Sequence, residues 1–146
     1  MKITSTAFAN NGNIPSKYTC DGANINPPLS FSEIPAAAKS LALISDDPDA
    51  PMGTWVHWTI WNIDPKTGSI AENSKPAGIE GTTSFGNTGY GGPCPPSGVH
   101  HYHFKLYALD TKLNLPISAK KTDLEKAMQK HILAQADLIG LYTRAK

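Results

Sequence analysis

The sequence YHFKLYAL at residues 102–109 decides the fold class, because its even-numbered positions are all apolar. Positions 103 and 105 carry histidine and lysine, so polar residues alternate with the apolar ones. Successive side chains of a β-strand point to opposite faces of its sheet. This stretch therefore predicts a strand with one buried face and one partly wet face, as antiparallel sheets commonly have.

Three more strands are predicted on either side of it. The run SLALIS at Ser40–Ser45 predicts a buried strand, and Thr54–Ile63 is rich in Trp, Val, Ile and Thr. Apolar and polar residues alternate again through Ile132–Tyr142, which favours a C-terminal strand, although its alanines and leucines also suit a helix. We therefore expect an all-β domain, an antiparallel β-sandwich or barrel with one or two short peripheral helices.

One segment predicts a helix. Leu124, Ala127, Met128 and His131 share one helical face, spaced i, i+3, i+4, i+7. Thr122 and the glutamate three residues later form a capping box at the expected start.

Length and charge restrict the class of protein. The chain has 146 residues, so we expect a single domain over residues 1–146. A net charge of +1 gives no electrostatic reason to expect nucleic acid or a membrane surface as a partner. No apolar run approaches a membrane span, and Met1–Asn10 lacks the apolar core of a signal peptide. The predicted location is the cytoplasm.

The two cysteines, Cys20 and Cys94, are too few for a disulfide scaffold and form no Cys-x-x-Cys zinc motif. In the cytosol of a mesophile we expect free thiols. A Cys20–Cys94 bridge is the alternative, which the disulfide-rich cytosol of a hyperthermophile permits.

The first cluster with chemical potential is DDPDAP at residues 46–51, followed by WVHW at residues 55–58. Three carboxylates within four residues repel one another, which a purely structural loop gains little from. A charged turn with local caps is the alternative interpretation. Strand alternation places His57 with Trp55 and Trp61 on one face and Trp58 on the other, so a tryptophan beside His57 can form the wall of a pocket.

The second cluster is YGGPCPPSGVHHY at residues 90–102. The amides of Gly91 and Gly92 can approach a ligand closely and form a nest for an anion. His100 shares the parity of Tyr102 and lies at the mouth of the buried face; a structural histidine at the core edge is the alternative. His101 and His103 share the other face, but a metal would need a third ligand from elsewhere.

Known hydrolase motifs are missing: the sequence has no Gly-x-Ser-x-Gly, no His-Glu-x-x-His and no Walker loop. We therefore expect a protein that is not an enzyme, without a cofactor or metal. A hydrolase or metal-dependent enzyme that uses Asp47, His57 and His100 is the alternative hypothesis.

Taken together, the two clusters resemble a known family. Asp-Pro-Asp-Ala-Pro, then Trp-x-His, then Gly-Pro-x-Pro-Pro-x-Gly-x-His-x-Tyr is similar to the signature pair of the phosphatidylethanolamine-binding proteins, also called Raf kinase inhibitor-like proteins. The stretch TCDGANINPPL at residues 19–29 and the ending from Thr122 through Tyr142 resemble the short prokaryotic branch. The resemblance covers nearly the whole chain.

The resemblance implies an antiparallel β-sandwich with a small pocket for phosphate-like anions near the sheet ends. The pocket aspartates match Asp47 and Asp49, and its first histidine matches His57. Gly91 is added to the matched residues because its backbone N–H is expected to donate to the anion. The predicted ligand-binding residues are Asp47, Asp49, His57, Gly91, Gly92, Pro93, His100 and Tyr102.

The functional hypothesis is a binding protein for phosphate, a phosphorylated small molecule or a phosphorylated protein group, which regulates a partner such as a kinase. The alternative is a protease inhibitor or interaction module that acts through an exposed loop. The resemblance also makes a homodimer an option, although nothing in the sequence marks an interface.

Overall fold

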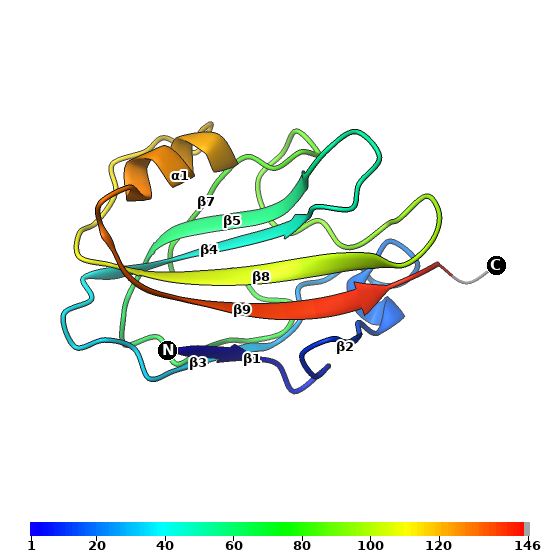
Figure 1. The fold of residues 1–146 in the computed structure, drawn as a ribbon, viewed down its shortest axis with the longest axis horizontal. Coiled ribbons are helices and arrows are strands. Elements are labelled where there is room, and N and C mark those ends of the chain that lie inside the picture. Colours follow the sequence, from blue (N-terminus) through cyan, green and yellow to red (C-terminus); the bar gives the residue numbers. More distant parts are fainter. Residues whose placement is uncertain (145–146) are drawn as a thin grey trace.

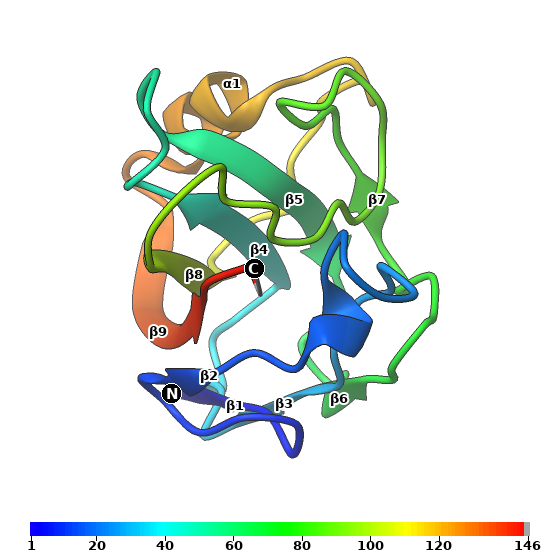
Figure 2. The same ribbon diagram turned by 90° about the vertical axis from the view of Figure 1, so that its right-hand side faces the viewer.

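The computed structural model describes residues 1–144, so the last two residues of the predicted single domain lie outside the described part. Two β-sheets and one α-helix are stacked in three layers, with the larger sheet in the middle (Figures 1 and 2). The elements in chain order are β1 (Lys2–Thr4), β2 (Gly12–Asn13), the 3-10 helix η1 (Ser16–Tyr18), β3 (Leu29–Ser32), β4 (Ser40–Asp47), β5 (Trp55–Ile63), β6 (Ser69–Ile70), β7 (Ile79–Glu80), β8 (His100–Leu109), α1 (Lys121–Met128) and β9 (Ile132–Tyr142).

The larger sheet has the strand order β2-β9-β8-β4-β5-β7, and the smaller sheet has the order β1-β3-β6. All neighbouring strands run antiparallel except the two-residue β2, which pairs parallel with β9. The predicted antiparallel sandwich with a peripheral helix is confirmed. Within residues 1–144 no helix is long and apolar enough to cross a membrane.

The strand β4 lies at the centre of the molecule and is buried along its whole length. Leu41 and Leu43 face the smaller sheet and pack in the main core with Phe31. Ala42 and Ile44 face the other way and form a second cluster beneath α1, with Trp61 and two helix residues, Leu124 and Met128. A strand covered on both faces needs apolar residues at successive positions, which explains the SLALIS run.

The predicted strands are confirmed, with small changes at their ends. β4 continues two residues past its predicted end, through Asp46 and Asp47, and β8 begins two residues early at His100. The C-terminal segment is the strand β9 and not a helix. Both extensions shape the candidate site, because they place Asp47 and His100 on regular strands and not in loops.

The predicted helix start was wrong by two residues. The N-cap is Lys120, whose backbone N–H donates to the carboxylate of Asp123 at 2.9 Å, whereas Thr122 lies inside α1. The end was also wrong, since the helix stops at Met128 and His131 lies beyond it. Lys130 adopts a left-handed conformation with φ 67°, which turns the chain away from the helix axis before His131.

Candidate functional site

One end of the sandwich holds a cavity of about 260 Å³. The connection between β4 and β5 that borders it lies at the right of Figure 1. It lies between the β4–β5 connection, the loop before β8 and the first residue of β8. Asp47, His57 and His100 all line it, so the structure brings the two clusters of the sequence together. The other lining residues are Ala50, Pro51, Met52, Trp55, Phe85, Cys94, Pro95 and Pro96.

The three aspartates of the first cluster point in different directions. Asp46 faces α1, where its carboxylate pairs with Lys105 at 3.2 Å and Lys121 at 2.8 Å. Asp47, the next residue of the strand, faces the cavity. Asp49 lies outside at the surface and pairs with His101 at 2.8 Å. Strand alternation separates Asp46 from Asp47, Asp49 lies in the turn beyond the strand, and each carboxylate has a cationic or hydrogen-bonding partner.

Asp47 and His100 form a buried pair. The His100 Nδ1 donates to Asp47 Oδ2 at 2.6 Å, and both side chains are less than a tenth exposed. The other ring nitrogen, Nε2, lies 3.1 Å from the carbonyl oxygen of Ser97. Both nitrogens of the His100 ring therefore face acceptors of the protein. The second Asp47 oxygen accepts the backbone N–H of Asp49 at 2.8 Å.

His57 reaches the cavity because of a β-bulge in β5. Ser45 on β4 lies opposite Trp58, and Asp46 lies opposite Val56, so His57 is an extra residue in the ladder. A bulge re-aims its side chains. His57 consequently contacts the ring of Tyr102 in the main core, at 5.3 Å between centroids, whereas Trp61 packs beneath α1. The predicted placement of His57 and Trp61 on one face was wrong, since regular alternation does not hold across a bulge.

The His57 ring is held in one tautomer. Its Nδ1 donates to the carbonyl oxygen of Gly91 at 2.7 Å, because a carbonyl can only accept. Burial of the ring lowers the pKa of His57 below its usual value, and this exceeds the opposing effects of the Gly91 carbonyl and the Asp47 carboxylate. The ring is therefore neutral near neutral pH, with its proton on Nδ1.

The glycines do not form the expected nest for an anion. The N–H of Gly91 donates to the carbonyl of His57 at 3.0 Å, and that of Gly92 donates to Asn24 Oδ1 at 2.8 Å. A Cβ on Gly92 would lie 2.3 Å from the carbonyl oxygen of Tyr18. Glycine is therefore needed here for the close approach of another loop of the protein, and the predicted backbone donors are already occupied.

The remaining predicted residues do not line the cavity. Tyr102 lies buried with its ring near both histidines, and burial together with the charge of Asp47 raises its pKa well above the usual range, so it stays a neutral phenol. Pro93 is buried and accepts the N–H of Cys20 at 3.1 Å. Asp49 is solvated, and hydrogen bonds from the backbone and ring of His101 lower its pKa.

Two residues that sequence reasoning missed shape the site. Phe85 lies in an irregular loop and contacts both Trp55 and His57 edge to face, at 5.4 Å between centroids. Asn24 fixes Gly92 from the distant TCDGANINPPL stretch. Loop residues without periodicity gave no signal of these contacts.

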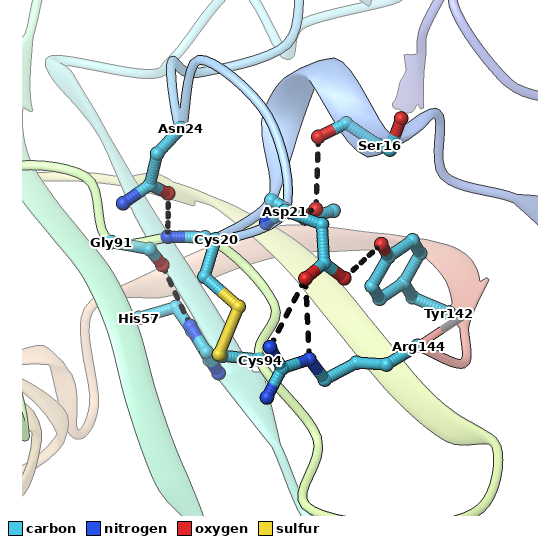
Figure 3. The surroundings of a disulfide bond; sticks show 11 residues. Ser16, Cys20, Asp21, Asn24, His57, Gly91, Cys94, Tyr142 and Arg144 are labelled. Atoms are coloured by element: carbon cyan, nitrogen blue, oxygen red, sulfur yellow. Dashed lines mark hydrogen bonds and ion pairs between the residues drawn. A yellow bond between two sulfur atoms is a disulfide. The ribbon is translucent and has the colours of Figure 1, made fainter. Parts of the chain in front are cut away.

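Cys20 and Cys94 form a disulfide, so the expectation of free thiols was wrong (Figure 3). Their Cα atoms lie 5.4 Å apart, a normal separation for such a bond. The bridge ties the loop after η1 to the cavity wall that Cys94 lines. The same loop is anchored to the end of β9, because Asp21 accepts hydrogen bonds from Tyr142 and Arg144 (Figure 3). The bridge and the predicted cytoplasmic location are compatible only in a cytosol that keeps disulfides oxidised.

Comparison with known proteins gives the family. A model of the phosphatidylethanolamine-binding protein family matches residues 4–143. The chain belongs to this family. Among its relatives, UPF0098 proteins of Methanothermobacter thermautotrophicus and Pyrococcus horikoshii are 53% and 52% identical to it; the matches cover 99% of this chain, and 99% and 77% of those proteins.

Solved structures of the family have the same fold. A phosphatidylethanolamine-binding protein homolog from Chlamydia trachomatis superposes with a TM-score of 0.96 at 42% identity, covering 99% of this chain and 97% of that one. Escherichia coli YbcL, described as a member of the mammalian family, gives 0.92 at 29% identity, with 99% and 98% covered. The likeness therefore extends over the whole sandwich, including the end that carries the cavity.

The buried pair predicts that Asp47 contributes more than Asp49 to the free energy of unfolding. Asp47→Ala leaves the His100 Nδ1–H without its acceptor in the interior, so we expect the free energy of unfolding to fall by about 3–5 kcal/mol. Asp49→Ala removes an exposed partner of His101, and we expect a loss of at most about 1 kcal/mol. Urea unfolding of the two variants at neutral pH measures both values. Equal losses would show that the Asp47–His100 pair does not stabilise this end of the fold.

The disulfide predicts a redox-dependent stability. It joins residues separated by 74 positions, and the chain-entropy model assigns such a link about 4 kcal/mol. We expect dithiothreitol to lower the urea midpoint of the native chain and to leave that of a Cys20→Ser/Cys94→Ser variant unchanged. The variant's midpoint is expected to coincide with that of the reduced native chain. A native midpoint that ignores the reductant, with reduction verified by thiol counting, would contradict this.

Proposed function

We propose that this member of the family is a non-enzymatic binding protein whose cavity holds phosphate or the phosphoryl group of a small molecule or phosphorylated side chain. One observation carries the proposal: His57 and His100 line the same cavity of about 260 Å³. In this proposal the bound phosphoryl group alters how a partner protein, such as a kinase, is recognised.

The charge of the cavity sets the condition for binding an anion. No lysine or arginine of residues 1–144 lines it, and the Asp47 carboxylate that lines it is paired with His100. A phosphate monoester carries about 1.5 to 2 negative charges at neutral pH. The group that can balance this charge is His57, since it is neutral in the free protein and has Nε2 available.

The remaining walls suit the rest of a ligand. Pro51, Pro95 and Pro96 stiffen two sides of the cavity, which lowers the entropy lost when a ligand binds. Trp55 and Phe85 are partly exposed and present apolar surface beside the opening. A phosphoryl group at the histidines with an apolar substituent toward this rim matches the distribution of polarity.

The proposal predicts that binding takes up a proton. A bound phosphoryl group raises the pKa of His57, which burial lowers in the free protein, so the bound state holds more protons than the free state. Above the lowered pKa of His57, affinity for inorganic phosphate should fall as pH rises, by up to about tenfold per pH unit for one proton. This pH dependence of the affinity is measured by NMR titration with phosphate or O-phosphoethanolamine, which follows the imidazole signals of His57 and His100.

The control for this titration is a histidine of the same chain outside the cavity. His131 pairs with Asp110 at the surface, so His131→Gln should leave the affinity unchanged, whereas His57→Gln should weaken it. Unchanged His57 and His100 signals at millimolar phosphate, in a folded sample, would refute the proposed ligand.

A second candidate function rests on a different observation. Met52 is 97% exposed, at the tip of the loop between β4 and β5, beside Gly53 with φ 108°. An exposed loop that presents an apolar side chain to solvent suits an interaction module, such as a protease inhibitor.

Inhibition assays against a panel of proteases separate the two candidates. If the loop carries the function, Met52→Asp abolishes inhibition and the His57→Gln/His100→Gln variant retains it. The absence of inhibition by the native chain would remove this second candidate.

A further inference from the structure

The free nitrogen of His57 distinguishes it from the other cavity histidine. Nδ1 donates a hydrogen bond to Gly91, which does not line the cavity, whereas the His57 side chain does line it. Figure 3 shows this ring nitrogen turned toward the Gly91 carbonyl. The hydrogen bond that the His57 ring makes within residues 1–144 is through Nδ1, and Nε2 makes none there. Both nitrogens of His100, in contrast, face acceptors of the protein. His57 thus presents an unprotonated, unpartnered imidazole nitrogen to the space where the phosphoryl group is expected.

We propose that His57 Nε2 accepts a phosphoryl group from a reactive donor held in the cavity, which makes His57 a site of stoichiometric phosphorylation. This inference rests on the proposed function, because the donor must first bind there. Suitable donors are small molecules with a high transfer potential, such as a phosphoramidate or an acyl phosphate. The reaction is a modification of the protein and requires no turnover.

The transfer balances without any further reactant. The Nε2 lone pair forms a bond to phosphorus, while the bond from phosphorus to the leaving group breaks and its electron pair leaves with that group. Phosphoramidate carries its proton on nitrogen at neutral pH and therefore leaves as ammonia. Nδ1 keeps its proton and its hydrogen bond to the Gly91 carbonyl oxygen.

The surroundings of His57 favour the charge that develops in this step. Attack by Nε2 makes the ring cationic, and the Gly91 carbonyl at 2.7 Å then accepts from a more acidic N–H. The carboxylates of Asp47 and Asp46 also favour a positive charge on the ring. Burial keeps the ring neutral in the free protein, with Nε2 unprotonated. Because a bound phosphoryl group raises the pKa of His57, transfer proceeds from the fraction of the complex whose Nε2 has lost its proton, and the labelling rate should rise with pH.

His131 is an internal control for the reaction. Its Nδ1 also faces an acceptor, the Asp110 carboxylate at 2.7 Å, so the same tautomer is favoured. It lies at the surface and lines no part of the cavity. Any nonspecific chemistry of an accessible imidazole should therefore occur at His131, whereas transfer that depends on binding should occur at His57.

The experiment follows phosphoramidate labelling of the native chain, digested and mapped by mass spectrometry at alkaline pH, where phosphohistidine survives. We expect the rate at His57 to saturate with donor concentration, to fall when inorganic phosphate competes, and to exceed that at His131 by about tenfold or more at low donor concentration, as proximity predicts. The rate at His131 should stay proportional to donor concentration and ignore phosphate. An alkali-stable, acid-labile adduct should be missing at position 57 in His57→Gln.

Three outcomes are informative when phosphate binding is measured in parallel by NMR. Saturable, phosphate-inhibited labelling of His57 supports the inference. If phosphate binds at the cavity but His57 remains unlabelled, or is labelled in the same unsaturated manner as His131, the inference is overturned and the proposed function stands. If phosphate does not bind, the proposed function fails and this inference fails with it. All three results come from the native chain, so none depends on the folding of a variant.

Discussion

The buried contact between Asp47 and His100 holds together the end of the molecule that carries the cavity. It joins the last residue of β4 to the first residue of β8, two neighbouring strands of the large sheet. The same carboxylate caps the loop that follows, through the N–H of Asp49. Because these interactions lie in a buried environment, their electrostatic energy is larger than at the surface. One carboxylate, that of Asp47, therefore holds both the first residue of β8 and the loop that follows β4.

Consecutive acidic residues are tolerated here because the strand sends them to opposite faces. Asp46 reaches lysines on β8 and α1, and Asp47 reaches a histidine on the other side of the sheet. On one face of β4 the Asp46 carboxylate binds a lysine of α1, and on the other face Asp47 lies in the candidate site. A helix or an irregular loop would not separate two adjacent carboxylates so completely.

The periodic parts of the structure could be predicted from sequence, and the parts that depend on an exception to periodicity could not. Alternation in YHFKLYAL and the double-faced run around Leu43 identified the central strands, and the motifs identified Asp47, His57 and His100. The bulge at His57 breaks the alternation on which the prediction for Trp61 depended. The roles of Gly91 and Gly92 were misjudged because glycine signals only close approach, and the approaching group is another loop. The contacts of Phe85 and the Cys20–Cys94 bridge join segments that are far apart in the sequence, and a local sequence pattern does not predict such pairs.

The disulfide also divides the chain topologically. Residues 20–94 form a covalent ring that contains β3 through β7, including the central hairpin of β4 and β5, whereas β8, α1 and β9 lie outside it. The tip of the β4–β5 loop, where Met52 is exposed, belongs to the ring. A protease that cut this tip would open the ring without releasing a fragment, and the nicked protein would separate into two pieces only under reducing conditions. The bridge thus preserves the physical continuity of the chain when this exposed loop is cut.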